Sequence, residues 1–309
     1  MKNKIIATLV ALGLVGSASA LDINENLTIN GFIDGSYQHT ERAATTQGLG
    51  LDEIELNFLF NVGGASGAIH LDDTDDGTGD SDVNVEQAFI GYGLENGLGF
   101  TLGRYGSLLG FEREDPTGLY TFSRAYSTGS GFNLGDVDTN VNEGLRVSYS
   151  SDVFGIDVSF QNTGNADIET NELDLEIALS YTGIENLAIG GGYHFDNQAN
   201  NANETDVLNI HASTTMGKFL LGAEYTELDT QGADLDGWMV LADYDISEKL
   251  GMVFRISSNE LAANQDYEKV TLAPNYALSD SLGVILEYSD VENAGTDGNE
   301  LALEFLFTF

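Results

Sequence analysis

The sequence predicts an all-β protein, namely a transmembrane antiparallel β-barrel of about 16 strands with a long third loop that folds inward. Three observations lead to this prediction. The chain ends on a strand with one apolar face, strand-like segments follow one another in a continuous array, and short connections alternate with long ones.

The last ten residues carry the clearest pattern. Apolar residues occupy every second position there, and mostly polar or small residues lie between them. Since side chains alternate across a strand, one face is wholly apolar, which suits contact with lipid and an aromatic girdle at the interface. The apolar set is Leu301, Leu303, Phe305, Phe307 and Phe309.

The first twenty residues resemble a secretory signal peptide. A basic head with Lys2 and Lys4 precedes an apolar run and the small-residue motif Ala18-Ser19-Ala20. We therefore expect residues 1–20 to be removed and residues 21–309 to form one barrel domain. No other segment approaches the roughly 20 apolar residues of a membrane helix, so a membrane location requires a closed barrel.

Sixteen segments have the length and alternation of strands. In one of them, Leu173, Leu175 and Ile177 face one way while Asp174 and Glu176 face the other. A proline inside the fourteenth segment, Pro274, predicts a local bulge or break. The predicted strands are 27–39, 49–62, 66–73, 83–95, 98–105, 141–151, 153–163, 171–182, 186–196, 204–216, 217–228, 235–245, 248–259, 266–278, 281–291 and 299–309.

The connections have two lengths. Every second connection is a tight turn of two or three residues, and the others are longer and rich in acids. Short turns on one rim and long loops on the other are typical of a transmembrane barrel, and an even strand number places both termini on the short-turn, periplasmic rim. The predicted long loops are 40–48, 74–82, 106–140, 164–170, 197–203, 229–234, 260–265 and 292–298.

The charge is strongly acidic, with 50 acidic and 11 basic residues, and there is no cysteine. This balance excludes nucleic acid as a partner and favours cations, and the fold must hold without disulfides. One acidic stretch imitates the start of an EF-hand loop, but Val83 stands where the bidentate glutamate belongs. Solvated acidic loops are the principal interpretation, with no cofactor expected. The alternative is a calcium site at Asp72, Asp73, Asp75 and Asp76.

The third long loop, 106–140, is far longer than the others, and a loop of this size is usually functional. We expect its aromatic residues to pack against the barrel wall, with sugar stacking as the alternative. Arg146 and Arg255 alternate out of phase with apolar neighbours and should point into the lumen. Their roles are either pairing with nearby acids or a transverse field at a constriction. Arg104 has outward parity, which implies a bulge near Gly103 or a position at the rim.

The stretch 102–112, followed by Ser123-Arg124-Ala125-Tyr126 and by 143–149, is similar to the OmpL-like β-barrel porin family. The whole chain resembles outer-membrane porins of Gram-negative bacteria. The resemblance implies a third loop that lines the pore constriction, a C-terminal signal read by the barrel assembly machinery through Phe305, Phe307 and Phe309, and a homotrimer. The constriction residues it implicates are Glu112, Arg113, Glu114, Asp115 and Arg124, with Arg146 on the opposing wall. Arg255 joins this set through its inward parity alone.

The resulting hypothesis is a non-enzymatic, water-filled channel in the bacterial outer membrane, surrounded by lipid and lipopolysaccharide. It would pass ions and small hydrophilic solutes by diffusion, with cations preferred. Two alternatives remain. One is a secreted or surface acidic β-rich binding protein, an adhesin or a calcium-binding protein, and the other is a barrel hydrolase that uses His211 beside an acid.

Overall fold

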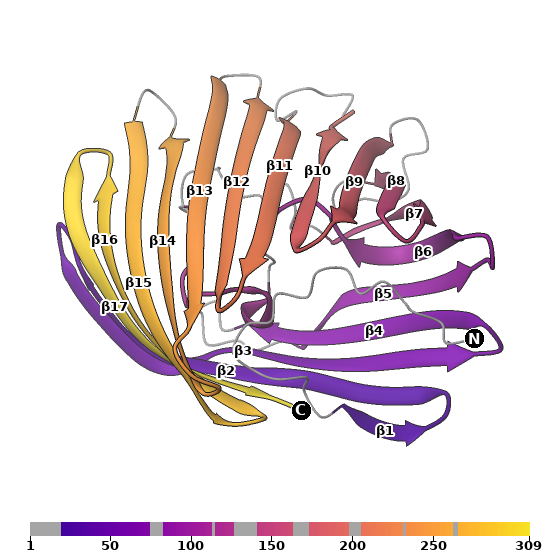
Figure 1. Cartoon of the computed structure of the whole chain (residues 1–309), viewed down its shortest axis with the longest axis horizontal. Coiled ribbons are helices and arrows are strands. Elements are labelled where there is room, and N and C mark those ends of the chain that lie inside the picture. Colours follow the sequence, from indigo (N-terminus) through magenta and orange to yellow (C-terminus); the bar gives the residue numbers. More distant parts are fainter. Residues whose placement is uncertain are drawn as a thin grey trace.

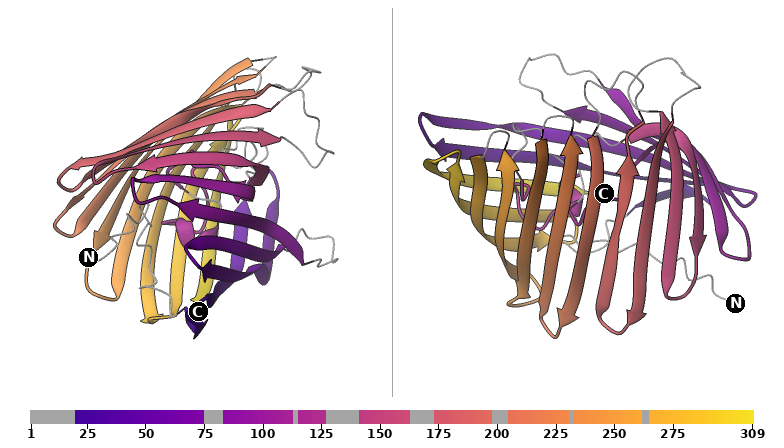
Figure 2. Two further views of the ribbon diagram at one scale, coloured as in Figure 1. Left: turned by 90° about the vertical axis from the view of Figure 1, so that its right-hand side faces the viewer. Right: turned by 90° about the horizontal axis from the view of Figure 1, so that it is seen from above.

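The computed structural model describes residues 20–74, 83–112, 115–126, 141–162, 173–197, 205–230, 233–261 and 265–309. Sixteen antiparallel strands, β2 to β17, form one closed ring in which each strand pairs with its sequence neighbours and β17 pairs with β2. Figure 1 shows the tilted strands of the wall, and Figure 2 shows the ring from two further sides. The fold class predicted from the sequence is confirmed.

The strands have the following bounds. They are β1 Leu21–Asn24, β2 Leu27–Glu41, β3 Thr45–Val62, β4 Ala65–Thr74, β5 Asn84–Gly93, β6 Leu98–Gly106, β7 Val141–Ser150, β8 Phe154–Asn162, β9 Asp174–Ile184, β10 Leu187–Phe195, β11 Thr205–Met216, β12 Phe219–Thr230, β13 Ala233–Asp245, β14 Leu250–Leu261, β15 Gln265–Ser279, β16 Leu282–Asn293 and β17 Thr296–Thr308. One 3₁₀ helix, η1 (Pro116–Gly118), lies in the third loop.

All sixteen predicted strands occur, within a few residues of their predicted bounds. The predicted loops 40–48, 229–234, 260–265 and 292–298 are wrong in length, because the flanking strands extend to within two or three residues of each other. At the last of these, Ala294 and Gly295 have φ values of 52° and 77°. Two successive positive φ values form the tight hairpin turn that suits the twist of the strands. Residues 1–19 of the predicted signal peptide lie outside the described residues.

The ring closes at the seam between β2 and β17. Beyond the last paired residues, the Gly31 amide donates to the Phe309 carbonyl at 3.0 Å, and the Phe309 amide donates to the Gly31 carbonyl at 3.1 Å. The short strand β1 then pairs with Leu27 to Ile29 of β2. A closed ring leaves no open sheet edge among these strands, which is what a lipid environment requires.

The outer face of the wall is apolar, as the C-terminal pattern predicts. Large hydrophobic side chains are exposed on β3 to β17, and Phe305 and Phe307 are among them. No helix among the described residues is long and apolar enough to cross a membrane. The exposed set on β14 to β16 is typical: Phe254, Ile256, Val270, Leu272, Leu286 and Tyr288.

Two local predictions have clear outcomes. The β15–β16 ladder is interrupted between Leu272 and Asn275, where Pro274 lies, and the same register resumes on both sides. Proline has no amide to donate, so a break without a bulge is the result. At Arg104 the bulge alternative is wrong, because β5, β6 and β7 stay in register there. Arg104 keeps its outward parity, two residues before the end of β6 on the long-loop rim.

Gly31 tests how closely β2 packs against β3 next to the seam. A Cβ atom at this position would lie 2.1 Å from the Glu55 carbonyl oxygen and 3.1 Å from the Phe309 ring, so β2 and β3 would have to separate. Gly31→Ala should lower barrel stability by about 1–3 kcal/mol, the usual cost of overpacking. The measurement is the temperature at which the folded barrel changes its migration in a detergent gel.

The matched control is Gly50→Ala on β3, where an added Cβ would meet nothing within 4 Å. This variant should keep the wild-type transition temperature. Equal transition temperatures for Gly31→Ala and Gly50→Ala would contradict the close packing assigned to Gly31.

Candidate functional site: the third loop inside the barrel

The described part of the third loop packs against the inner face of the wall. Leu109 joins a buried apolar cluster with Ala178, Val207, Leu228 and Leu235. A second cluster contains Tyr120 together with Leu241, Val253, Ala273 and Ile285 of β13 to β16, with Phe111 packed against it. In Figures 1 and 2 the segment containing η1 lies within the ring of strands.

Wall carboxylates bind the backbone of the loop as it crosses from β6. Glu176 of β9 accepts from the Leu108 amide at 3.1 Å and from the Ser107 hydroxyl at 2.6 Å. Glu224 of β12 accepts from the Phe111 amide at 2.6 Å. These acids pair buried amides that no strand partner could satisfy.

Arg255 of β14 fixes the middle of the loop. Its guanidinium binds Glu112 (Nη1 to Oε1, 2.5 Å) and donates through Nη2 to the carbonyl oxygens of Ser123 and Arg124 at 2.8 and 2.9 Å. The Arg255 side chain is 0% exposed, and that of Glu112 is 8% exposed. A charge buried this deeply is tolerated only when it is paired and hydrogen-bonded, so Arg255 anchors the loop.

A second basic residue holds the returning segment. Lys269 of β15 donates to the Ser123 hydroxyl at 2.6 Å and pairs with Glu300 at 3.0 Å. Glu287 of β16 accepts from the Ser123 amide at 3.0 Å and also binds the Ser123 hydroxyl. Ser123 therefore connects the loop to β14, β15 and β16 at once.

Arg146 of β7 lies at the start of the loop. Its guanidinium donates to the Gly106 carbonyl at 2.5 Å and sits 4.2 Å above the centre of the Tyr105 ring. The Tyr105 hydroxyl is hydrogen-bonded to Ser159 at 2.7 Å. A cation over an aromatic face is favourable, so Arg146 holds the point at which the chain leaves the wall.

The loop also meets an acidic part of the wall. Carboxylate oxygens of Glu53 and Glu55 on β3 and of Asp115 in the loop lie within 4.8 Å of one another. Glu53 and Asp115 are partly exposed. Among the described residues, no ion pair joins Glu53 or Glu55 to a lysine or arginine. Three acidic side chains are therefore close together where the loop meets β3.

The loop aromatics serve packing, as predicted. Phe111 stacks on Tyr120 with ring centres 5.6 Å apart, and the Tyr126 hydroxyl donates to Glu224 at 3.2 Å. Burial raises the pKa of Tyr120 to about 12 and raises the pKa of Tyr126 well above its usual value. Both phenols stay neutral at physiological pH, so they add no charge to the lumen.

The structure brings Glu112, Arg124 and Arg255 together, places Asp115 beside β3, and sets Arg146 at the root of the loop. Arg113 and Glu114 lie outside the described residues. For the predicted calcium residues, Asp72 and Asp73 lie in strand β4, and Asp75 and Asp76 are outside the described residues. His211 contacts Asn209 (Nδ1 to Oδ1, 3.0 Å) and lies edge-on to the Phe111 ring.

Several site residues were missed from the sequence. Lys269, Glu176, Glu224 and Glu287 all face the lumen and bind the loop. Each is out of phase with apolar neighbours in its strand, so the alternation that selected Arg146 and Arg255 could have selected them. The abundance of acidic residues in this chain hid the signal of the three glutamates.

The fold resembles solved outer-membrane barrels. The anion-selective porin of Comamonas acidovorans is 16% identical, with a TM-score of 0.70 and coverage of 92% of this chain and 99% of the other. OmpF of Salmonella typhi, solved with daunomycin, is 14% identical, with a TM-score of 0.72 and coverage of 94% and 100%. The trimer form of OmpT of Vibrio cholerae is 15% identical, with a TM-score of 0.64 and coverage of 92% and 100%. No curated protein matched the sequence.

A closed ring of sixteen strands, with an apolar outer face and a long loop held against its inner wall, defines the class of transmembrane β-barrels built as channels. The family model described as Gram-negative porin matches residues 7–296. The chain therefore belongs to the Gram-negative porin family, and its location is the bacterial outer membrane. The narrower resemblance to OmpL-like porins stays a prediction.

The Glu112–Arg255 pair generates a prediction. Glu112→Gln leaves the buried guanidinium without its carboxylate, and removing one partner of a buried pair costs about 3–5 kcal/mol. The variant should unfold at a lower temperature and show noisier single-channel currents, because the loop is no longer fixed. The double variant Glu112→Gln/Arg255→Met removes the unpaired charge and should recover part of the stability.

Glu95→Gln is the charge-matched control, since Glu95 is exposed in a short turn between β5 and β6. It should behave as wild type in both measurements. If Glu112→Gln had the same unfolding temperature and the same single-channel current noise as Glu95→Gln, the anchoring role of the pair would be refuted.

Proposed function

We propose that the protein is a non-enzymatic, water-filled channel through which ions and small hydrophilic solutes cross the outer membrane by diffusion. The observation that carries this proposal is the third loop, which is bound to the inner wall rather than extended from the rim. Porin family membership supports it. A loop held inside the ring narrows the passage and sets its charge.

We further propose that the passage prefers cations. The basic groups Arg255 and Lys269 are buried and bound to the loop or to acids, so their charges are compensated. Glu53 and Asp115 are partly exposed and close together. Selectivity depends on the few charges at the narrowest point, since more distant loop charges are screened within about 8–10 Å at physiological salt.

The constriction in this proposal consists of the third loop and the wall that faces it. Glu112 and Arg255 give the loop its position, Arg146 holds its root, and Asp115 supplies negative charge. Arg124, Arg113 and Glu114 complete the set predicted from the sequence. The porin of Comamonas acidovorans, which has a similar fold, is anion-selective. The shared fold therefore does not decide selectivity, and the side chains of this chain must.

The partners follow from the same proposal. We expect a homotrimer in contact with lipid and lipopolysaccharide, and a C-terminal strand ending in Phe309 that the barrel assembly machinery recognises. The trimer form of OmpT of Vibrio cholerae shows that a barrel of this fold can assemble in threes. Chemical cross-linking in detergent should give a ladder that ends at three chains, and a ladder that ends at one chain would contradict the trimer.

The decisive experiment is planar-bilayer conductance of the mature chain in a salt gradient. Stepwise openings with a cation-selective reversal potential are expected. Glu53→Gln/Asp115→Asn should move the reversal potential toward zero, because two lumen carboxylates are neutralised. Silence from a verified folded barrel would overturn the channel, and anion selectivity of the wild type would overturn the cation preference.

Asp152→Asn combined with Glu95→Gln is the matched control. It also removes two negative charges, but from exposed short turns. Salt screens charges at these positions from ions in the passage. The control should keep the wild-type reversal potential. Equal shifts in both double variants would show that net charge, rather than the loop and its facing wall, sets the selectivity.

A further inference from the structure

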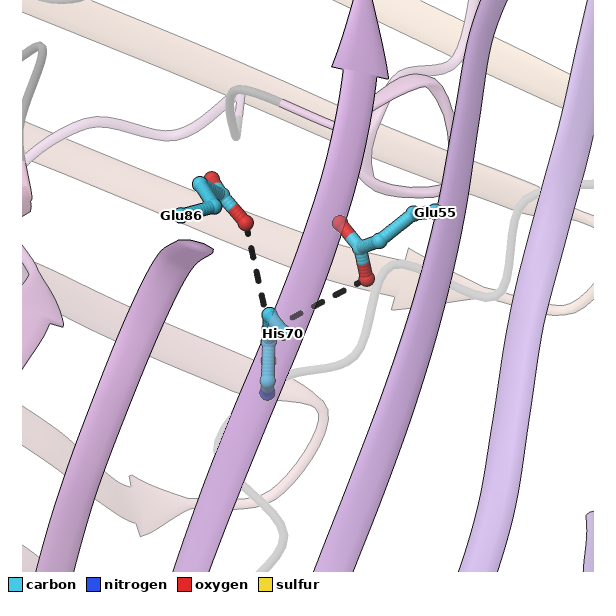
Figure 3. Close-up of side chains that lie close together, drawn as sticks. All are labelled: Glu55, His70 and Glu86. Carbon is cyan, nitrogen blue, oxygen red and sulfur yellow. Dashed lines mark ion pairs between the residues drawn. The ribbon is translucent and has the colours of Figure 1, made fainter. Parts of the chain in front are cut away.

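Three neighbouring strands bring two carboxylates and one imidazole together on the acidic side of the wall. Glu55 comes from β3, His70 from β4 and Glu86 from β5. His70 Nδ1 lies 3.9 Å from Glu55 Oε1 and 3.9 Å from Glu86 Oε2. Figure 3 shows the two carboxylates approaching His70 from the two flanking strands.

A β-bulge places Glu86 in this group. The β4–β5 register shifts between His70, which pairs with Gln87, and Leu71, which pairs with Val85, so Glu86 has no partner residue on β4. By strict alternation Gln87 faces inward with His70 and Glu86 would face lipid. The bulge turns Glu86 back toward the lumen, which is a recognised use of bulges beside functional sites.

Within this group Glu55 is deeply buried, and His70 and Glu86 are partly buried. Glu55 is only 2% exposed, and its Oε2 atom has no hydrogen-bond partner among the described residues. His70 Nδ1 also lacks a hydrogen bond there. The other oxygen of Glu55 accepts from the Asn57 amide, which fixes the carboxylate orientation. An unpaired carboxylate oxygen buried this deeply is costly unless a cation completes it.

We infer that Glu55, His70 and Glu86 form a binding site for one divalent transition-metal ion such as Zn²⁺. An imidazole nitrogen with two carboxylate oxygens is a donor set that suits zinc, whereas calcium and magnesium prefer oxygen alone. Ligand atoms of one tetrahedral zinc ion are about 3.4 Å apart, given bonds of about 2.0–2.2 Å. The observed 3.9 Å separations therefore close by small side-chain rotations.

The same ion would alter the lumen next to the third loop. Glu55 also belongs to the group with Glu53 and Asp115, so a bound dication neutralises negative charge where the loop meets the wall. Metal binding is a separate property from conductance and does not depend on the channel proposal.

The test is isothermal titration calorimetry of the mature, folded barrel in detergent after chelator treatment. Zn²⁺, Ca²⁺ and Mg²⁺ are titrated in separate experiments. We expect one Zn²⁺ per chain, bound at least 100-fold more tightly than Ca²⁺ or Mg²⁺. His70→Gln should weaken Zn²⁺ binding at least tenfold. Absent Zn²⁺ binding, or equal affinity for all three ions, would overturn the inference.

His194→Gln is the matched control, because His194 of β10 is also buried and lies 3.9 Å from a carboxylate oxygen of Asp174 on β9. It should bind Zn²⁺ as wild type does, and unchanged binding in His70→Gln would overturn the assignment.

Should His70→Gln fail to fold, Co²⁺ absorption of the wild-type barrel supplies the second readout. Visible bands typical of nitrogen and oxygen ligation support the site, and the spectrum of hydrated Co²⁺ refutes it. A silent channel that binds Zn²⁺ would refute only the channel proposal.

Discussion

The arrangement of the lumen depends on one constraint: a loop held inside a barrel must find hydrogen-bond partners for its backbone away from any strand. Glu176, Glu224 and Glu287 accept from loop amides, and Arg255 donates to two loop carbonyls. The inner wall thus performs for the loop what a neighbouring strand performs in a sheet. Apolar clusters around Leu109 and Tyr120 then exclude water from these contacts.

This constraint divides the acidic residues by role. Those on β9, β12 and β16 hold the loop through hydrogen bonds. Arg255 pairs with Glu112 of the loop, and Lys269 pairs with Glu287 of β16. Those on β3, Glu53 and Glu55, instead lie close to Asp115 of the loop. The acids of the inner wall therefore differ in role, and a net charge taken over the whole chain conceals that difference.

Alternation and connection lengths together were sufficient to predict the wall. Alternation as in Leu173 to Ile177 specifies which side chains meet lipid, and two connection lengths specify the rims, so strand number and closure follow. The loop anchors could not be predicted, because pairing Glu112 with Arg255 requires knowing which strand faces the loop. The inward position of Glu86 could not be predicted for a different reason. A bulge reverses the face on which Glu86 lies, and the sequence alternation does not reveal where a bulge inserts its extra residue. The break at Pro274 could be predicted, because proline lacks a backbone amide hydrogen wherever it stands in the chain.

Pairing of each strand with its neighbours in sequence has a consequence for the order of folding. Every strand pair except β17–β2 is local in sequence, so hairpins can form as the chain is added, at small entropic cost. The loop anchors are different: Ser123 and Glu287 are 164 residues apart, and Glu112 and Arg255 are 143 residues apart. The loop can acquire its final contacts only after β14 to β16 exist, when the seam is nearly ready to close. Completion of the wall and docking of its inner loop are therefore late events that belong to the same stage of assembly.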